Sequence, residues 1–268
     1  MARAFRVVWL ALLVASIGSA QQLYVPAAAH TSGAAGTVWR TDLEVKARAN
    51  EPAWFTVELL QERTANPYPL LASFSLEPGA SLRLVDVVDT VFGFYGSGAL
   101  RLTATAGAIL ATSRTYNTNP NGTFGQYIPG FEAESAAEHG NDYVLMQLSS
   151  SAAFRTNVGF VNTTDATMAL EVDLYTASAD LLGSVPVTLR PFEMRQIPAV
   201  FTLVTSDPVE DGYALVRTST ESGRYFAYAS VVDNLSGDAI FVPAQLDGPL
   251  EVPPEPRFVV FEAFMRYG

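Results

Sequence analysis

A chain of 268 residues in which 49% are hydrophobic and 16% are charged has enough apolar side chains to bury real cores, which excludes an intrinsically disordered protein. The formal net charge of −11 argues against nucleic acid as a partner, because phosphate neutralisation needs clustered lysine and arginine. The chain has no cysteine, so it contains neither disulfides nor a lipid-modified N-terminal cysteine.

The first 20 residues have the pattern of a signal peptide. Arg3 and Arg6 precede an apolar run over residues 7–14, and small residues lead to Ala20, after which we expect cleavage. A single membrane anchor is the alternative, but this run is shorter than the roughly 20 residues that a spanning helix needs. We therefore expect a soluble mature chain without a membrane span, extracellular or periplasmic. An exported protein of this size without cysteine fits a bacterial cell envelope better than an animal secretory route.

Short strands are predicted along the rest of the chain. Apolar and polar residues alternate with a period of two, which is typical of half-buried strands, in residues 41–45, 55–59, 158–160 and 170–174. Two further apolar strands are expected at residues 185–189 and 225–232. Turn signals such as Glu77-Pro78-Gly79 and Ser236-Gly237-Asp238 separate these segments.

The second half of the chain repeats the first. Arg40-Thr41 returns as Arg155-Thr156, and the strand around Glu58 returns around Asp173, both at a distance of about 115 positions. Further along, Ser113–Asn117 aligns with residues 230–234. A period close to one domain length indicates duplicated whole domains rather than a solenoid.

The predicted fold is all-β, with two tandem antiparallel β-sandwich domains that arose by internal duplication and are immunoglobulin-like in the broad sense. A pair of small barrels is the alternative. An aromatic-aliphatic-proline step recurs at Tyr24, Tyr127 and Phe241 and brackets each unit, so repeat 1 is placed at residues 21–129 and repeat 2 at 130–246. Residues 247–268 form an acidic, proline-rich tail that ends in a short apolar segment.

A resemblance to known proteins rests on three segments: Trp39-Arg40-Thr41-Asp42, Ser113-Arg114-Thr115-Tyr116-Asn117 and Gly122-Thr123-Phe124-Gly125-Gln126. With the export signal, they make residues 23–245 resemble uncharacterised bacterial exported proteins with paired immunoglobulin-like β-sandwich domains. The resemblance implies the fold and the compartment, and it carries over no activity and no functional residue.

The sequence contains no convincing set of catalytic residues, and we expect no enzymatic activity. His30 and His139 are the only histidines, and both are interpreted as ordinary solvated side chains. Two carboxylate pairs have residue types that glycosidases use: Asp86 with Asp89, and Glu58 with Asp173. Because Glu58 and Asp173 are repeat equivalents, we expect them on the solvated face of equivalent strands.

Acidic residues crowd two stretches and suggest oxygen ligands for calcium. The candidates are Glu132, Glu134, Glu138 and Asp142 between the units, and Asp207, Glu210 and Asp211 in a loop of the second. Solvated loops are the preferred explanation, so we expect no cofactor and keep calcium as the alternative.

Aromatic side chains form the last candidate site, because rings on an exposed sheet face stack on sugars. The candidates are Tyr116, Phe124, Tyr127, Tyr225, Phe226 and Tyr228. The sequence therefore predicts a non-enzymatic structural or adhesion-like module, secreted or at the cell envelope, whose partner is a protein or polysaccharide there. A carbohydrate-binding or, failing that, carbohydrate-degrading extracellular protein is the alternative, and an exposed row of aromatics would favour it.

Overall fold

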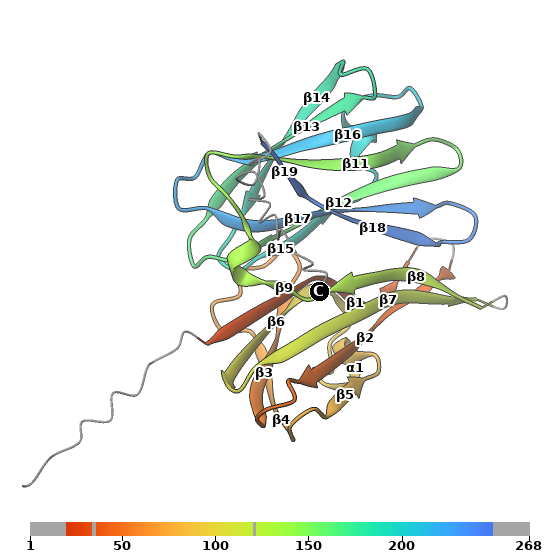
Figure 1. Ribbon diagram of the computed structural model, residues 1–268. Coiled ribbons are helices and arrows are strands. Elements are labelled where there is room, and N and C mark those ends of the chain that lie inside the picture. The colour runs from red at the N-terminus through yellow and green to blue at the C-terminus, as the bar shows by residue number, and fades with distance from the viewer. Residues whose placement is uncertain (1–19, 34–35, 120–121, 249–268) are drawn as a thin grey trace, which may run out of the picture. The chain divides into compact units, whose positions relative to one another are not determined.

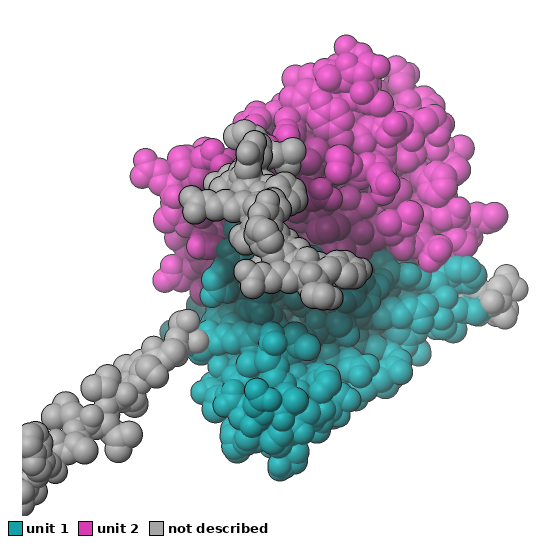
Figure 2. Space-filling view, viewed as in Figure 1, with its two compact units in different colours: residues 1–136 teal, residues 137–268 magenta. Residues whose placement is uncertain are grey.

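The computed structural model describes residues 20–33, 36–119 and 122–248 (Figure 1). They form an all-β protein with antiparallel sheets, which confirms the predicted class at this level. The chain divides into two compact units between Ala136 and Ala137, coloured separately in Figure 2. The predicted junction near Pro129 lies a few residues earlier. Residues 1–19 of the predicted leader and residues 249–268 of the tail lie outside the described residues.

The first unit contains two sheets that meet in strand β1. Its elements are β1 (Gln21–Ser32), β2 (Val38–Ala47), β3 (Ala53–Gln61), β4 (Leu70–Leu76), β5 (Ser81–Leu84), α1 (Val87–Thr90), β6 (Gly96–Ala106), β7 (Ile109–Asn119), β8 (Gly122–Pro129), β9 (Phe131–Glu132) and the 3-10 turn η2 (Ala133–Ser135). One sheet has the order β4-β3-β6-β1-β9 and the other β5-β2-β7-β8, and the pairing of β1 with β2 joins them into one continuous nine-stranded sheet. β1 pairs with β6 up to His30 and with β2 at Thr31 and Ser32, after a register shift between Val25 and Ala28. The last two residues of β1 thus extend the strand from one sheet into the other.

The predicted alternation places the core of this unit. Phe55, Val57 and Leu59 on β3 and Leu43 and Val45 on β2 are at most 1% exposed. Each such side chain contributes about 1.5–3 kcal/mol when fully buried, so the facing apolar rows of the two sheets hold the unit together.

The second unit also contains two sheets. Its elements are β10 (Ala137–Glu138), β11 (Asp142–Ser150), β12 (Phe154–Asn162), β13 (Met168–Thr176), β14 (Leu181–Leu189), β15 (Met194–Ile197), η3 (Val200–Leu203), β16 (Val209–Thr218), β17 (Arg224–Asp233), β18 (Ala239–Pro243) and β19 (Gln245–Asp247). One sheet has the order β14-β13-β16-β11-β19, and the other β15-β12-β17-β18 with β10 beside β17. Phe160, Val172, Leu174 and Phe201 belong to its hydrophobic core.

The two units have the same strand order. If β1 to β9 are renumbered β11 to β19, each sheet of the first unit becomes a sheet of the second, apart from the added β10. The short helical turns α1 and η3 also occupy the same place in the chain order. Equivalent positions of the two units can therefore be compared with each other.

Within the described residues, no helix is long and apolar enough to cross a membrane.

The segment Gly93–Gly98 is only partly a turn. β6 begins at Gly96, opposite His30 on β1. A Cβ atom on Gly98 would lie 2.5 Å from the backbone oxygen of Leu60, so glycine allows β6 to approach β3 closely.

Candidate functional site

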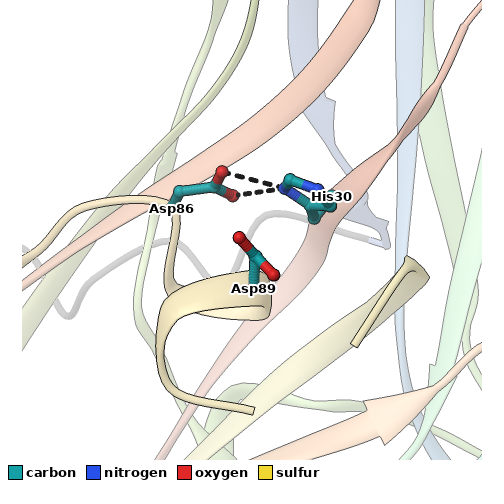
Figure 3. A group of neighbouring side chains, drawn as sticks. All are labelled: His30, Asp86 and Asp89. Atoms are coloured by element: carbon teal, nitrogen blue, oxygen red, sulfur yellow. Dashed lines mark hydrogen bonds and ion pairs between the residues drawn. The ribbon is translucent and has the colours of Figure 1, made fainter. Parts of the chain in front are cut away.

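A histidine and two aspartates meet in the first unit, from segments far apart in sequence (Figure 3). His30 lies near the end of β1, Asp86 caps the start of α1, and Asp89 lies within that turn. Asp86 has left-handed backbone angles of φ 50° and ψ 53°, which aspartate tolerates better than most residues. The backbone N–H groups of Asp89 and Thr90 both donate to the Asp86 carbonyl, so this turn holds the two carboxylates three positions apart.

His30 and Asp86 form a close, mostly buried pair. His30 Nδ1 lies 2.8 Å and 3.0 Å from the two carboxylate oxygens of Asp86, and the two side chains are 19% and 12% exposed. Tyr95 contacts the imidazole edge-on, with ring centroids 5.7 Å apart. Asp89 is exposed, and Figure 3 shows its carboxylate beside the pair. The nitrogen and oxygen ligand atoms of His30, Asp86 and Asp89 all lie within 4.8 Å of one another. His30 is thus not the solvated loop residue that we expected.

Asp42 on β2 anchors this turn by hydrogen bonds. One of its oxygens accepts the backbone N–H of Asp86 at 3.0 Å and the hydroxyl of Tyr116 at 3.3 Å, and the other accepts Arg83 at 2.7 Å. Burial opposes ionisation, but the hydrogen bonds from Arg83 and from the backbone of Asp86 outweigh it and lower the pKa of Asp42. Arg40 approaches from the open side, with Nε 3.6 Å from Asp86 Oδ2.

The second unit contains an equivalent turn in which uncharged residues replace Asp86 and Asp42. Ala199 precedes η3 with φ 45° and ψ 50°, and its backbone N–H donates to Asn157 Oδ1 at 3.1 Å. Asn157 stands two residues after Arg155 on β12, as Asp42 stands two residues after Arg40 on β2. A side-chain oxygen accepts this backbone N–H in both units, from a carboxylate in the first and from an amide in the second.

A second shared hydrogen bond aligns the first strands of the units. Thr41 Oγ1 accepts the backbone N–H of Ala29 at 2.8 Å, and Thr156 Oγ1 accepts that of Ser149 at 3.1 Å. With both alignments, the equivalents of the cluster residues follow: His30 corresponds to Ser150, Asp86 to Ala199 and Asp89 to Thr202. None of the three residues in the second unit is ionisable.

An exposed surface beside the cluster contains arginine and tyrosine. We call Arg40, Arg114, Tyr116 and Tyr127 the Arg-Tyr face; they lie on β2, β7 and β8, and all are exposed except Tyr116, which is half-buried. Arg114 stands opposite Tyr127 and lies over the ring of Tyr116, with Cζ 5.0 Å from the ring centroid. Tyr127 is 61% exposed. Phe124 lies on the opposite face of β8 and is half-buried.

The other three predicted aromatics are buried. Tyr225 and Tyr228 are 0% exposed and Phe226 is 6% exposed. Tyr225 donates its hydroxyl to the Val216 carbonyl at 3.1 Å, and burial raises its pKa. Tyr228 donates to Gln196 at 3.0 Å. Tyr225 belongs to the hydrophobic core of the second unit, and the ring of Tyr228 stacks on Phe241, so the three residues offer no exposed stacking platform.

The predicted acidic ligands are scattered. Glu132, Glu134 and Glu138 are exposed, Asp142 is half-buried at the start of β11, and Glu132 accepts a hydrogen bond from Gln21. Asp207, Glu210 and Asp211 are exposed and line one open depression beside Thr176. In the described part of the chain, the only group of three with ligand atoms this close is His30, Asp86 and Asp89.

Glu58 and Asp173 each bind an arginine on the neighbouring strand. Arg101 donates to both oxygens of Glu58 at 2.6 and 3.0 Å, while Arg217 and Ser184 donate to Asp173. Glu58 and Asp173 are only 9% and 4% exposed, so the prediction that they lie on a solvated strand face is wrong for both residues. Each belongs to a structural ion pair of its own unit.

A comparison with protein-family models and with curated proteins found no match. The Asp86-Asp89 spacing is visible in the sequence, but nothing in it indicates that His30, 56 positions from Asp86, is their neighbour.

Proposed function

We propose that the chain is an exported, non-enzymatic binding module of two immunoglobulin-like β-sandwich domains that arose by duplication. The shared strand orders, the recurrent Arg-Thr steps and the left-handed residue before each helical turn support the duplication. Export to a bacterial cell envelope rests on the leader pattern and on the absence of cysteine.

The Arg-Tyr face is the partner surface in this proposal. In the second unit, the ladder positions of Arg114, Tyr116 and Tyr127 are taken by Ser230, Val232 and Phe241. Ser230 and Val232 are 5% and 2% exposed, whereas Arg114 and Tyr127 are exposed. Tyrosine and arginine are the residue types that dominate protein interfaces. The two units share their architecture, but only the first has an exposed Arg-Tyr face. This observation is the main support for an adhesion-like role.

A polysaccharide is the second candidate ligand. The exposed ring of Tyr127, next to the Arg114 guanidinium, offers a stacking surface with a hydrogen-bond donor beside it. The buried Tyr225, Phe226 and Tyr228 contribute nothing to this surface, so the first unit alone would bind the sugar.

The test uses the chain from Gln21 onward, which contains every described strand. Binding to isolated bacterial envelopes and to a polysaccharide panel is measured for the wild type, Arg114→Ala and Tyr127→Ala. Tyr68→Ala is the matched control, because Tyr68 is 95% exposed and lies outside the Arg-Tyr face.

We expect saturable envelope binding that both face variants weaken at least tenfold and Tyr68→Ala leaves unchanged. Saturable glycan binding with the same pattern would assign a carbohydrate ligand. Binding that survives both face variants would contradict the surface assignment.

A further inference from the structure

We propose that His30, Asp86 and Asp89 form a binding site for a divalent transition-metal ion of the Zn²⁺ class in the first unit. The inference is independent of the partner surface proposed above, because metal binding is measured on the chain alone.

The donor atoms suit such an ion. Zn²⁺ takes imidazole nitrogen and carboxylate oxygen at about 2.0–2.2 Å, so two ligands of one ion lie at most about 4.3 Å apart. The three ligand atoms lie within 4.8 Å of one another. Asp86 and His30 are held by the turn and by β1, and the exposed Asp89 side chain can close the remaining distance by rotation. The mixture of nitrogen and oxygen donors favours Zn²⁺ over Ca²⁺, which prefers oxygen alone.

The second unit forms the equivalent turn without ionisable groups at these positions. The equivalent turn of the second unit keeps the same backbone angles at Ala199 and the same hydrogen bond to Asn157. Ser150 and Thr202, which replace His30 and Asp89, line an open depression there. A purely structural explanation accounts for the pair formed by His30 and Asp86, but it does not explain why the Asp89 carboxylate lies beside them.

The local charges leave room for a cation. Arg83 is bound to Asp42, so Arg40 is the cation that faces Asp86. Its Nε lies 3.6 Å from the carboxylate, beyond hydrogen-bond distance, and its side chain is 47% exposed. No described residue forms a hydrogen bond or ion pair with the Asp89 carboxylate. A neutral imidazole that binds the ion through Nδ1 carries its proton on Nε2.

Calorimetry with Zn²⁺ tests the proposal on the chain from Gln21 onward. We expect one Zn²⁺ per chain and a dissociation constant that Asp89→Asn raises at least tenfold, since even outer-sphere partners of a metal change affinity by roughly 10–100-fold. Asp89 is exposed, so this variant keeps the fold. Asp207→Asn removes an equally exposed acid from the second unit and should leave the affinity unchanged.

The variant Arg40→Gln tests whether the cluster is a metal site or only an ion-pair network. Removing the competing cation should tighten Zn²⁺ binding severalfold if the ion lies between the carboxylates. Unchanged affinity in both Asp89→Asn and Arg40→Gln would overturn the proposal.

Nitrogen NMR identifies the ligand directly, because the chain has two histidines. Stoichiometric Zn²⁺ should shift Nδ1 of His30 and leave His139, which is exposed, unchanged. A shift confined to His139 would mean adventitious surface binding and would refute the site. Tighter binding of Ca²⁺ than of Zn²⁺ would equally contradict the assignment.

Discussion

The carboxylate of Asp42 accepts the backbone N–H of Asp86 at 3.0 Å across 44 positions of sequence. In the second unit, the backbone N–H of Ala199 donates the equivalent hydrogen bond to the uncharged side chain of Asn157. The contribution of this hydrogen bond to stability can therefore be distinguished from the contribution of the negative charge of Asp42.

Two substitutions of Asp42 should distinguish the contribution of the hydrogen bond from that of the charge. Asp42→Asn keeps an oxygen acceptor and loses only the ion pair with Arg83, whose side chain is 64% exposed, so we expect the free energy of unfolding to fall by less than about 1 kcal/mol. Asp42→Ala leaves the Asp86 N–H without its partner and should cost about 2 kcal/mol. Urea unfolding measures both, and equal losses would contradict the argument.

Acid should erase the difference between the wild type and Asp42→Asn. The folded-state pKa of Asp42 is lowered, so its ionised form stabilises the fold above the unfolded-state pKa of about 3.9, and this contribution is lost as pH falls through the folded value. The difference in free energy of unfolding should be constant between about pH 5 and 7 and shrink below about pH 4. A difference that grows on acidification would reverse the sign of the predicted linkage.

Arg101 should matter more than its counterpart Arg217. Arg101→Met leaves the buried carboxylate of Glu58 without its bidentate partner, and we expect a loss of about 3 kcal/mol or more in unfolding free energy. The double variant with Glu58→Gln should recover much of it. Arg217 is 38% exposed, against 14% for Arg101, so water can replace it and Arg217→Met should cost less. The reverse order in thermal or urea unfolding would contradict this assignment.

Tyr228 should act on stability rather than on ligand binding. A Cβ atom on Gly159 would lie 2.1 Å from the Tyr228 ring, so Gly159→Ala should cost about 1–3 kcal/mol by forcing the ring to move. Tyr228→Phe removes the hydrogen bond to Gln196 and should cost about 1 kcal/mol. Gly248→Ala, whose Cβ would meet nothing closer than 3.5 Å, is the neutral control. Loss of envelope or glycan binding with unchanged stability in Tyr228→Phe would show that this residue contacts a ligand.

The period-two pattern predicted the strands well because alternation is a local property of the backbone. The strands expected at residues 185–189 and 225–232 are parts of β14 and β17. The alignment of Ser113 with Ser230 is less exact. The ladders place Ser113 opposite Leu43 and Ser230 opposite Asn157, so, with Arg40 matched to Arg155, Ser113 corresponds to Ala229. A shift of one residue moves every side chain to the other face, and similarity along the chain does not detect it.

The sequence by itself determined the all-β class, the strand positions and the internal similarity, because periodicity and repeated residues are written along the chain. The tertiary structure decided which side chains meet and which are covered. His30 joins Asp86 only because β1 and the turn after β5 come together across 56 positions, and Tyr228 is buried whereas Tyr127 is exposed although both lie in short strands. Alternation assigns a side chain to a face of its strand, but long-range packing determines what lies against that face.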